Sequence, residues 1–270
     1  MTSSQRIAAA FAAAKAQSRP ALVAYLTAGD PSPSRSASLA LALERGGADV
    51  LELGVPFSDP VADGPVIQHA SDRALRAGAN VHRVLEIASE IRASSAMPII
   101  LFSYLNPLLR YGFEALARDA RAAGVDGCLL TDLSVEEAAG PVSKLRAAGL
   151  DTVFLAAPTS TERRLKLVSE LSSGFVYVVS TTGVTGERDT VAASVEPLVS
   201  ILRTLTALPL AVGFGVSKPE HVSAIGGYAD GVVVGSAIMR VVEQYGTAPD
   251  LERRLENLMR SLSGKETGPQ

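Results

Sequence analysis

Leu51–Pro65, which reads LELGVPFSDPVADGP, holds the residues whose types and spacing suggest chemistry most clearly. Glu52 lies within an apolar run, where a carboxylate is out of place, and Asp63 follows in a proline-rich loop. A strand that ends in a loop with a second acid is a common way to build an acid–base site, because the strand fixes one group and the loop brings in the other. The segment therefore predicts proton transfer between side chain and substrate.

The position of Glu52 on a strand leaves two environments open. Its neighbours Leu51 and Leu53 should face covering helices, so Glu52 should point into the interior of the fold. Burial there would raise the pKa of its carboxyl and let it exchange a proton near neutral pH. The alternative is a solvated residue on an edge strand.

The two aspartates of the loop also have structural interpretations. Asp63, in the sequence VADGP, could form a turn or cap a helix that begins near Pro65. Asp59 lies between Ser58 and Pro60, which is more typical of a residue that shapes a loop or forms a contact surface than of a catalyst.

Eight short runs rich in β-forming residues must position these groups. They are largely apolar rather than alternating, as is typical of strands covered on both faces. They lie at Ala21–Leu26, Val50–Leu53, Ile99–Tyr104, Gly127–Thr131, Thr152–Ala156, Phe175–Ser180, Leu210–Phe214 and Gly231–Val234. Helical patterns separate them, so the chain predicts an α/β fold with a parallel sheet, most simply a closed (β/α)8 TIM barrel. An open doubly wound sheet is the alternative.

The barrel is expected to be a single domain over residues 1–270, with an extra N-terminal helix. The gap between the second and third strands is the longest, and it holds the 51–65 loop and an additional helix around Val66–Ala77. A long insertion of this kind is often functional. The polar tail, about 263–270, is expected to be frayed.

Polar residues and glycines gather where the predicted strands end, which is the face that carries the active site in such barrels. The last three strands are followed by glycine-rich segments that could cradle a phosphate, because backbone N–H groups can approach its oxygens there. Glycine also serves tight turns, so each position alone is ambiguous. The candidate positions are Gly183, Gly186, Gly213, Gly215, Gly235 and Ser236.

The composition argues against several other classes of protein. A net charge of -3 gives no basic surplus for nucleic acid or an anionic membrane. Cys128 is the only cysteine, which rules out an intrachain disulfide, and the three histidines, His69, His82 and His221, lack metal-ligand spacing. With no signal-peptide pattern and no long apolar run, we expect a cytoplasmic protein without a metal ion.

Several longer motifs give the chain a recognisable resemblance. They share their order along the sequence and together span roughly residues 20 to 245. They are 27-TAGDP-31, 51-LELGVPFSDPVADGP-65, 104-YLNP-107, 157-APTS-160, 182-TGVTG-186, 212-VGFGV-216 and 235-GSA-237. In these motifs the chain resembles the tryptophan synthase alpha subunit family.

The resemblance implies a (β/α)8 barrel that cleaves indole-3-glycerol phosphate to indole and glyceraldehyde 3-phosphate, a lyase reaction of tryptophan biosynthesis. By match to the family, Glu52 is the acid–base residue, and Asp63 accepts a hydrogen bond from the indole N–H. Tyr177 matches a residue that helps to position Glu52. Thr185 matches a lid residue that couples loop closure to Asp63.

The resemblance also implies binding residues and a partner. Phosphate contacts would come from Gly186, Phe214, Gly215, Gly235 and Ser236, and the indole pocket from Tyr25, Tyr104 and Leu129. Asp59 and Pro60 match a loop that touches the beta subunit in an α2β2 complex. Pyridoxal phosphate is expected in that beta subunit, and no cofactor in this chain.

The chain departs from the family at two positions and leaves two other functions to consider. Tyr25 stands where phenylalanine is common, which adds a hydroxyl to the indole pocket, and Asp132-Leu-Ser134 stands where Asp-Leu-Pro is usual. Another phosphate-binding barrel enzyme, such as an isomerase or a thiamin phosphate synthase type enzyme, would explain the glycines but not the 51–65 segment. A non-enzymatic subunit that only activates or channels to a partner would leave Glu52 and Asp63 unexplained.

Overall fold

Eight parallel strands close into a barrel in the computed structural model, which describes residues 3–179, 189–213 and 215–264. The strands are β1 (Ala21–Thr27), β2 (Val50–Gly54), β3 (Ile99–Ser103), β4 (Gly127–Leu130), β5 (Asp151–Ala156), β6 (Val176–Val179), β7 (Leu210–Gly213) and β8 (Gly231–Val234). Each strand pairs with the next, and β8 pairs with β1. The closed barrel is therefore confirmed, and the open doubly wound sheet is wrong.

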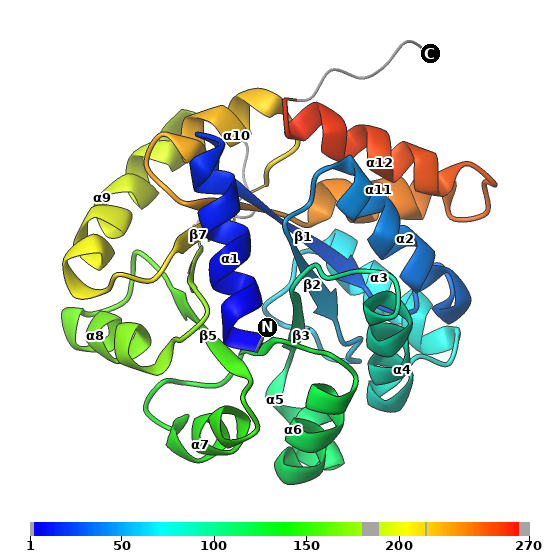
Figure 1. Ribbon diagram of the computed structural model, residues 1–270, viewed down its shortest axis with the longest axis horizontal. Helices are drawn as coiled ribbons and strands as arrows, with labels where there is room; N and C mark the ends of the chain where they lie inside the picture. The colour runs from blue at the N-terminus through cyan, green and yellow to red at the C-terminus, as the bar shows by residue number, and fades with distance from the viewer. Residues whose placement is uncertain (1–2, 180–188, 214, 265–270) are drawn as a thin grey trace.

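Helices surround the barrel, and one lies across its end (Figure 1). They are α1 (Ser3–Ala16), α2 (Pro33–Gly46), α3 (Pro65–Arg76), α4 (Val81–Arg92), α5 (Leu105–Tyr111), α6 (Phe113–Ala122), α7 (Ala139–Ala147), α8 (Glu162–Leu171), α9 (Asp189–Leu205), α10 (Pro219–Gly226), α11 (Ser236–Tyr245) and α12 (Leu251–Leu262). The extra N-terminal helix is α1, and the insertion after β2 contains α3. Pro65 begins α3, where its missing N–H costs no helical hydrogen bond.

Two apolar cores follow from the alternation of side chains along the strands. The outer core fills the space between the sheet and the helices, and it contains Leu51 and Leu53 of β2. The inner core fills the barrel, and it contains Val50 of the same strand. Helix α1 closes the N-terminal end of this inner core, because Phe11 packs against Phe175 with ring centroids 5.5 Å apart.

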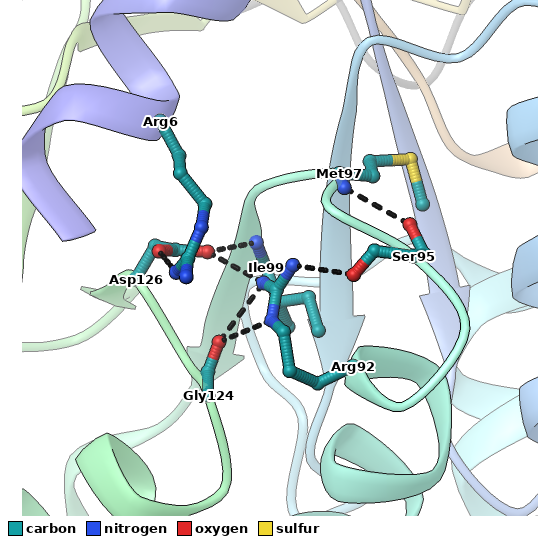
Figure 2. Close-up of polar contacts among 7 residues, drawn as sticks. All are labelled: Arg6, Arg92, Ser95, Met97, Ile99, Gly124 and Asp126. Atoms are coloured by element: carbon teal, nitrogen blue, oxygen red, sulfur yellow. Dashed lines mark hydrogen bonds and ion pairs between the residues drawn. The ribbon is translucent and has the colours of Figure 1, made fainter. Parts of the chain in front are cut away.

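A buried aspartate fastens α1 and two strands together at this end of the barrel (Figure 2). Asp126 immediately precedes β4 and is fully buried. Its carboxylate accepts a hydrogen bond of 2.9 Å from the backbone N–H of Ile99 on β3. It also forms ion pairs with Arg6 of α1 at 2.7 Å and Arg92 of α4 at 2.8 Å. One side chain thus holds β3, β4, α1 and α4 in place.

The same kind of link recurs at the other odd–even strand pairs. Asp49, before β2, accepts a hydrogen bond from the N–H of Leu22 on β1 at 2.8 Å. Asp230, before β8, accepts one from Leu210 on β7 at 2.8 Å, and both aspartates also pair with an arginine. Between β5 and β6 the hydroxyl of Ser173 takes this place. The N-terminal end of the barrel is therefore a layer of side-chain links that contribute to stability, which leaves the opposite end available for chemistry.

We predict that Asp126→Asn lowers the free energy of unfolding by about 3 kcal/mol, because it removes one partner of a buried ion-pair network and leaves two arginines uncompensated. Urea unfolding measures this difference. The control is Asp72→Asn, which breaks an exposed pair with Arg76 on α3 and should cost no more than about 0.5 kcal/mol. An equal effect of the two substitutions would contradict the role given to Asp126.

Candidate active site

Glu52 points into the barrel and has no partner there. It lies two residues after Val50, which belongs to the inner core, and between Leu51 and Leu53, which belong to the outer core. The side chain is fully buried, and within the described part of the chain neither carboxyl oxygen has a hydrogen-bond partner. The predicted inward orientation is confirmed, and the edge-strand alternative is wrong because a closed barrel has no edge.

Burial governs the protonation of Glu52. The loss of hydration disfavours the charged form, which raises the pKa of this carboxyl from the usual 4.5 to about 8. Glu52 is therefore mainly protonated at neutral pH and can donate a proton to a bound substrate.

Asp63 lies above the barrel in the loop between β2 and α3. Its Oδ2 accepts a hydrogen bond of 3.0 Å from the hydroxyl of Tyr104, which follows β3, and the same hydroxyl accepts one of 2.9 Å from the N–H of Ala62. The backbone N–H of Asp63 closes a turn on the carbonyl oxygen of Pro60. Of the two structural roles considered for Asp63, the turn is confirmed and the helix cap is wrong, because Gly64 is the N-cap of α3.

The two carboxyl groups differ in charge at neutral pH. Burial raises the pKa of Asp63 from 3.8 to about 6, and the hydrogen bond from Tyr104 opposes this rise by stabilising the ionised form. Asp63 is therefore mainly ionised at the pH where Glu52 is mainly protonated. Two carboxyl groups held in opposite protonation states can serve as an acid and as an electrostatic stabiliser in one reaction.

Tyrosines surround the two carboxyl groups. We call the site formed by these residues the chamber and define it as Glu52, Asp63, Tyr25, Tyr104 and Tyr177. Tyr25 on β1 is in register with Glu52 on β2. Burial raises the pKa of Tyr177 well above its usual value, and the charges of Glu52 and Asp63 add to the rise. Within the described residues no hydrogen bond joins Tyr177 to Glu52, so the positioning role expected for Tyr177 stays a prediction.

Two glycines make room for these tyrosines, and sequence reasoning missed this role. A Cβ at Gly54 would come within 2.3 Å of the Tyr25 hydroxyl, and one at Gly213 within 2.2 Å of the Tyr177 hydroxyl. Gly213 was also a candidate for the phosphate cradle, and that role stays a prediction; the Tyr177 side chain of the neighbouring strand lies where a Cβ of Gly213 would be. In the sequence, the only sign of this role is a tyrosine on one strand and a glycine on the next. The strand register, which the sequence does not give, decides that the two residues meet.

The other predicted residues fall into three groups. Leu129 is fully buried within the inner core, where it is in register with Phe102 and Val153. Gly235 and Ser236 form the N-cap and first residue of α11, and a Cβ at Gly215 would meet open space. Thr185, Gly186 and Phe214, and also Gly183, lie outside the described residues.

The helix α11 offers unpaired backbone N–H groups at its first turn, as any helix N-terminus does, and these groups and the helix dipole favour an anion. It follows β8 directly, so its N-terminus opens at the same end of the barrel as Glu52 and Asp63. An anionic group of a substrate can thus be held at Gly235 and Ser236 while its reacting part lies over β2. Among the described residues, no three His, Cys, Asp or Glu side chains gather where they could hold a metal ion.

Two loop features outside the chamber support its walls. Asp132, after β4, accepts a hydrogen bond of 2.6 Å from the N–H of Leu105 at the start of α5, which ties this loop to the segment after β3. Pro60 and Asp59 lie in the loop before Asp63, and Asp59 is exposed. The side chain of Gln68 on α3 donates a hydrogen bond of 2.8 Å to the carbonyl oxygen of Asp63. The loop that carries Asp63 is thus held from both sides.

We predict that Glu52 makes the stability of the fold fall as the pH rises. Its pKa in the folded chain lies above 4.5, so the folded state binds the proton more tightly than the unfolded state, and this contribution is full below about pH 4.5 and lost as pH rises through about 8. Glutamine cannot ionise. Urea unfolding should therefore show Glu52→Gln to be more stable than the wild type at about pH 9, with little difference at about pH 5. The same difference at both pH values would show that Glu52 is not buried as a neutral acid.

Comparison with known proteins gives this site a family. The family model described as tryptophan synthase alpha chain matches residues 11–266. A tryptophan synthase alpha chain from Solibacter usitatus is 59% identical over 257 residues, which cover 95% of this chain and 96% of that protein, and one from Geobacter sulfurreducens is 48% identical with 95% and 97% covered. A crystal structure of tryptophan synthase subunit alpha from Legionella pneumophila superposes with a TM-score of 0.89 at 36% identity, covering 98% of both chains. The chain therefore belongs to the tryptophan synthase alpha chain family.

Proposed function

We propose that this chain catalyses the alpha reaction of tryptophan synthase through Glu52 and Asp63. The reaction is the retro-aldol cleavage of indole-3-glycerol phosphate to indole and glyceraldehyde 3-phosphate, which makes the chain a lyase of tryptophan biosynthesis. Family membership supports the reaction. The observation that supports the assignment of residues is the pair of carboxyl groups with opposite charge states at neutral pH. Neither of the other two functions considered above requires such a pair.

In the proposed mechanism Glu52 gives up a proton at the start of the cycle and regains one at the end. Protonated Glu52 donates to the indole ring carbon that bears the glycerol phosphate chain, and positive charge develops on the ring nitrogen. The Asp63 carboxylate accepts a hydrogen bond from the ring N–H and stabilises that charge. The Glu52 carboxylate then takes the proton of the side-chain hydroxyl next to the ring. The carbon–carbon bond breaks, its electrons restore the indole ring, and the aldehyde forms.

The substrate is held between the inner barrel wall and the helix α11 in this proposal. Tyr25, Tyr104 and Leu129 contact the indole ring, and their burial around the barrel mouth supports an apolar pocket. Gly235 and Ser236 bind the phosphate with the help of Gly215, Gly186 and Phe214. Tyr177 positions Glu52, and Thr185 belongs to a segment that closes over the site.

We predict that Glu52→Gln abolishes cleavage and that Asp63→Asn lowers kcat by at least about a hundredfold, or about 3 kcal/mol of transition-state stabilisation. Indole release from indole-3-glycerol phosphate measures both. Asp72→Asn, on the exposed face of α3, is the control and should keep the wild-type rate. A fully active Glu52→Gln variant would remove Glu52 from the mechanism, and a loss confined to KM in Asp63→Asn would make Asp63 a binding residue only.

We also propose a beta subunit as partner, in an α2β2 complex, at the surface around Asp59 and Pro60. A cavity of about 550 Å³ opens beside this loop between α3, α4 and α5, and its lining includes Phe57 and Pro107. Val61 on the loop and Leu109 on α5 leave 84% and 52% of their surface exposed. Exposed apolar residues beside a cavity are typical of a protein interface.

We predict that Leu109→Asp weakens the complex with the beta subunit at least about tenfold and reduces the stimulation of indole release, while the free chain keeps its own activity. Calorimetric titration with the beta subunit measures the affinity. Ile201→Asp is a matched control, because Ile201 is 47% exposed and belongs to α9, which lies on another side of the barrel from α5 (Figure 1). Equal weakening by both substitutions, or by neither, would place the interface elsewhere.

The cofactor and the compartment follow from the same proposal. The acid–base chemistry of Glu52 and Asp63 needs no cofactor in this chain, and pyridoxal phosphate belongs to the beta subunit. A cytoplasmic location is supported by the free, buried state of Cys128, the only cysteine of the sequence. No helix in the described ranges has the length and apolar character needed to cross a membrane.

A further inference from the structure

Arg73 on α3 joins three elements at the C-terminal end of the barrel. Its guanidinium forms a bidentate pair with Asp30, which follows β1, with Nε donating to Oδ1 at 2.9 Å and Nη2 to Oδ2 at 2.8 Å. The remaining Nη1 donates to Oε1 of Glu243 on α11 at 2.9 Å. One side chain thus links α3 to the loop after β1 and to α11.

The pair with Asp30 anchors this link to the barrel. The Asp30 side chain is fully buried and that of Arg73 is 31% exposed, so solvent screens the pair only weakly. Burial raises the pKa of Asp30, and the Arg73 guanidinium opposes this rise by stabilising the ionised carboxylate. The loop itself is tied to β2, because the N–H of Ala28 donates to the carbonyl oxygen of Gly54 at 2.9 Å. Arg73 is therefore bonded to a fixed part of the fold.

Both helices that Arg73 links begin at the proposed active site. Helix α3 starts just after Asp63, whose carbonyl oxygen accepts the hydrogen bond from Gln68 of the same helix. Helix α11 starts at Ser236, where the phosphate is proposed to bind. Arg73 and Glu243 each lie about two turns after the start of their helix. Their contact therefore holds the two helix starts at a fixed separation.

The proposed substrate has two ends that bind at these two helix starts. Its indole N–H binds Asp63, and its phosphate binds Gly235 and Ser236. Once one end is bound, the other end is held close to its own site, so the two contacts reinforce each other only when the spacing of the sites matches the substrate. A displacement of about 1 Å can cost about a hundredfold in rate, even when it arises far from the reacting atoms.

We propose that Arg73 is a positioning residue that sets the spacing between Asp63 and the N-terminus of α11. The proposal rests on the function proposed above and adds a residue two helical turns away from both binding sites. Asp30 anchors the guanidinium, and Glu243 extends the link to α11. His69, one turn before Arg73, has its Nδ1 3.5 Å from the same Glu243 oxygen and lies beside the link. Loss of the link should weaken binding of the whole substrate but not of its separate parts.

The test compares the whole substrate with its two parts. Titrations followed by NMR give dissociation constants for indole-3-glycerol phosphate, indole and glycerol 3-phosphate, all in a Glu52→Gln background that does not cleave the substrate. Arg73→Lys keeps a positive charge for Asp30 but cannot form the fork and also reach Glu243. It should weaken binding of the whole substrate at least about tenfold and binding of either part by no more than about twofold.

Two further variants make this result specific. Glu243→Ala removes only the link to α11, from a side chain that is 41% exposed, so it should leave the fold intact. It should weaken binding of the whole substrate by about threefold, with the parts unaffected. Arg19→Lys makes the matched change in the bidentate pair with Asp49 at the N-terminal end of the barrel, and it should leave all three affinities unchanged.

Three results would overturn the proposal. Equal weakening of the whole substrate and its parts in Arg73→Lys would reduce Arg73 to a residue that only stabilises the fold. Unchanged binding of the whole substrate would show that the link does not set the spacing. If the Glu52→Gln chain does not bind indole-3-glycerol phosphate at all, the function proposed above is wrong and this proposal falls with it. Should Arg73→Lys fail to fold, Glu243→Ala decides by the same comparison.

Discussion

The structure depends on one costly feature, a carboxyl group buried without a partner inside a closed barrel. Removing Glu52 from water disfavours its charge so strongly that its pKa reaches about 8. That shift is what allows a glutamate to act as an acid at neutral pH. Burial also means that the folded state loses stability whenever Glu52 ionises. The rest of the barrel must therefore be stable enough to keep Glu52 buried.

The two ends of the barrel have different polar groups. At the N-terminal end, α1 seals the inner core, and Asp126 and its equivalents link neighbouring strands through backbone N–H groups and arginines. At the C-terminal end the strands finish in loops that hold Asp63, Tyr104 and the first turn of α11. Both ends carry strong polar links, since Asp30 after β1 pairs with Arg73 of α3, but the unpaired carboxyl group of Glu52 lies toward the C-terminal end.

Much of this arrangement was predictable from sequence, because it rests on local patterns. The apolar runs placed every strand to within one residue of its observed bounds, and the alternation around Glu52 gave its inward direction. The roles of Tyr104 and of the Asp126 links could not be predicted from local patterns. Each joins residues far apart in the chain, and only the closure of the barrel brings such residues together. The same holds for Gly54 beneath Tyr25, where a strand register decides which side chain fills the empty place.

The central claim is that the barrel interior keeps Glu52 neutral at the pH where Asp63 is charged. Infrared difference spectroscopy tests it directly, by following the carbonyl stretch of a protonated carboxyl group against pH in the wild type and in Glu52→Gln. The account predicts one protonated carboxyl at about pH 7 that is absent from the variant and titrates near pH 8. A band that disappears by about pH 5 would show that Glu52 is ionised in the resting chain, and the assignment of Glu52 as the acid would be wrong.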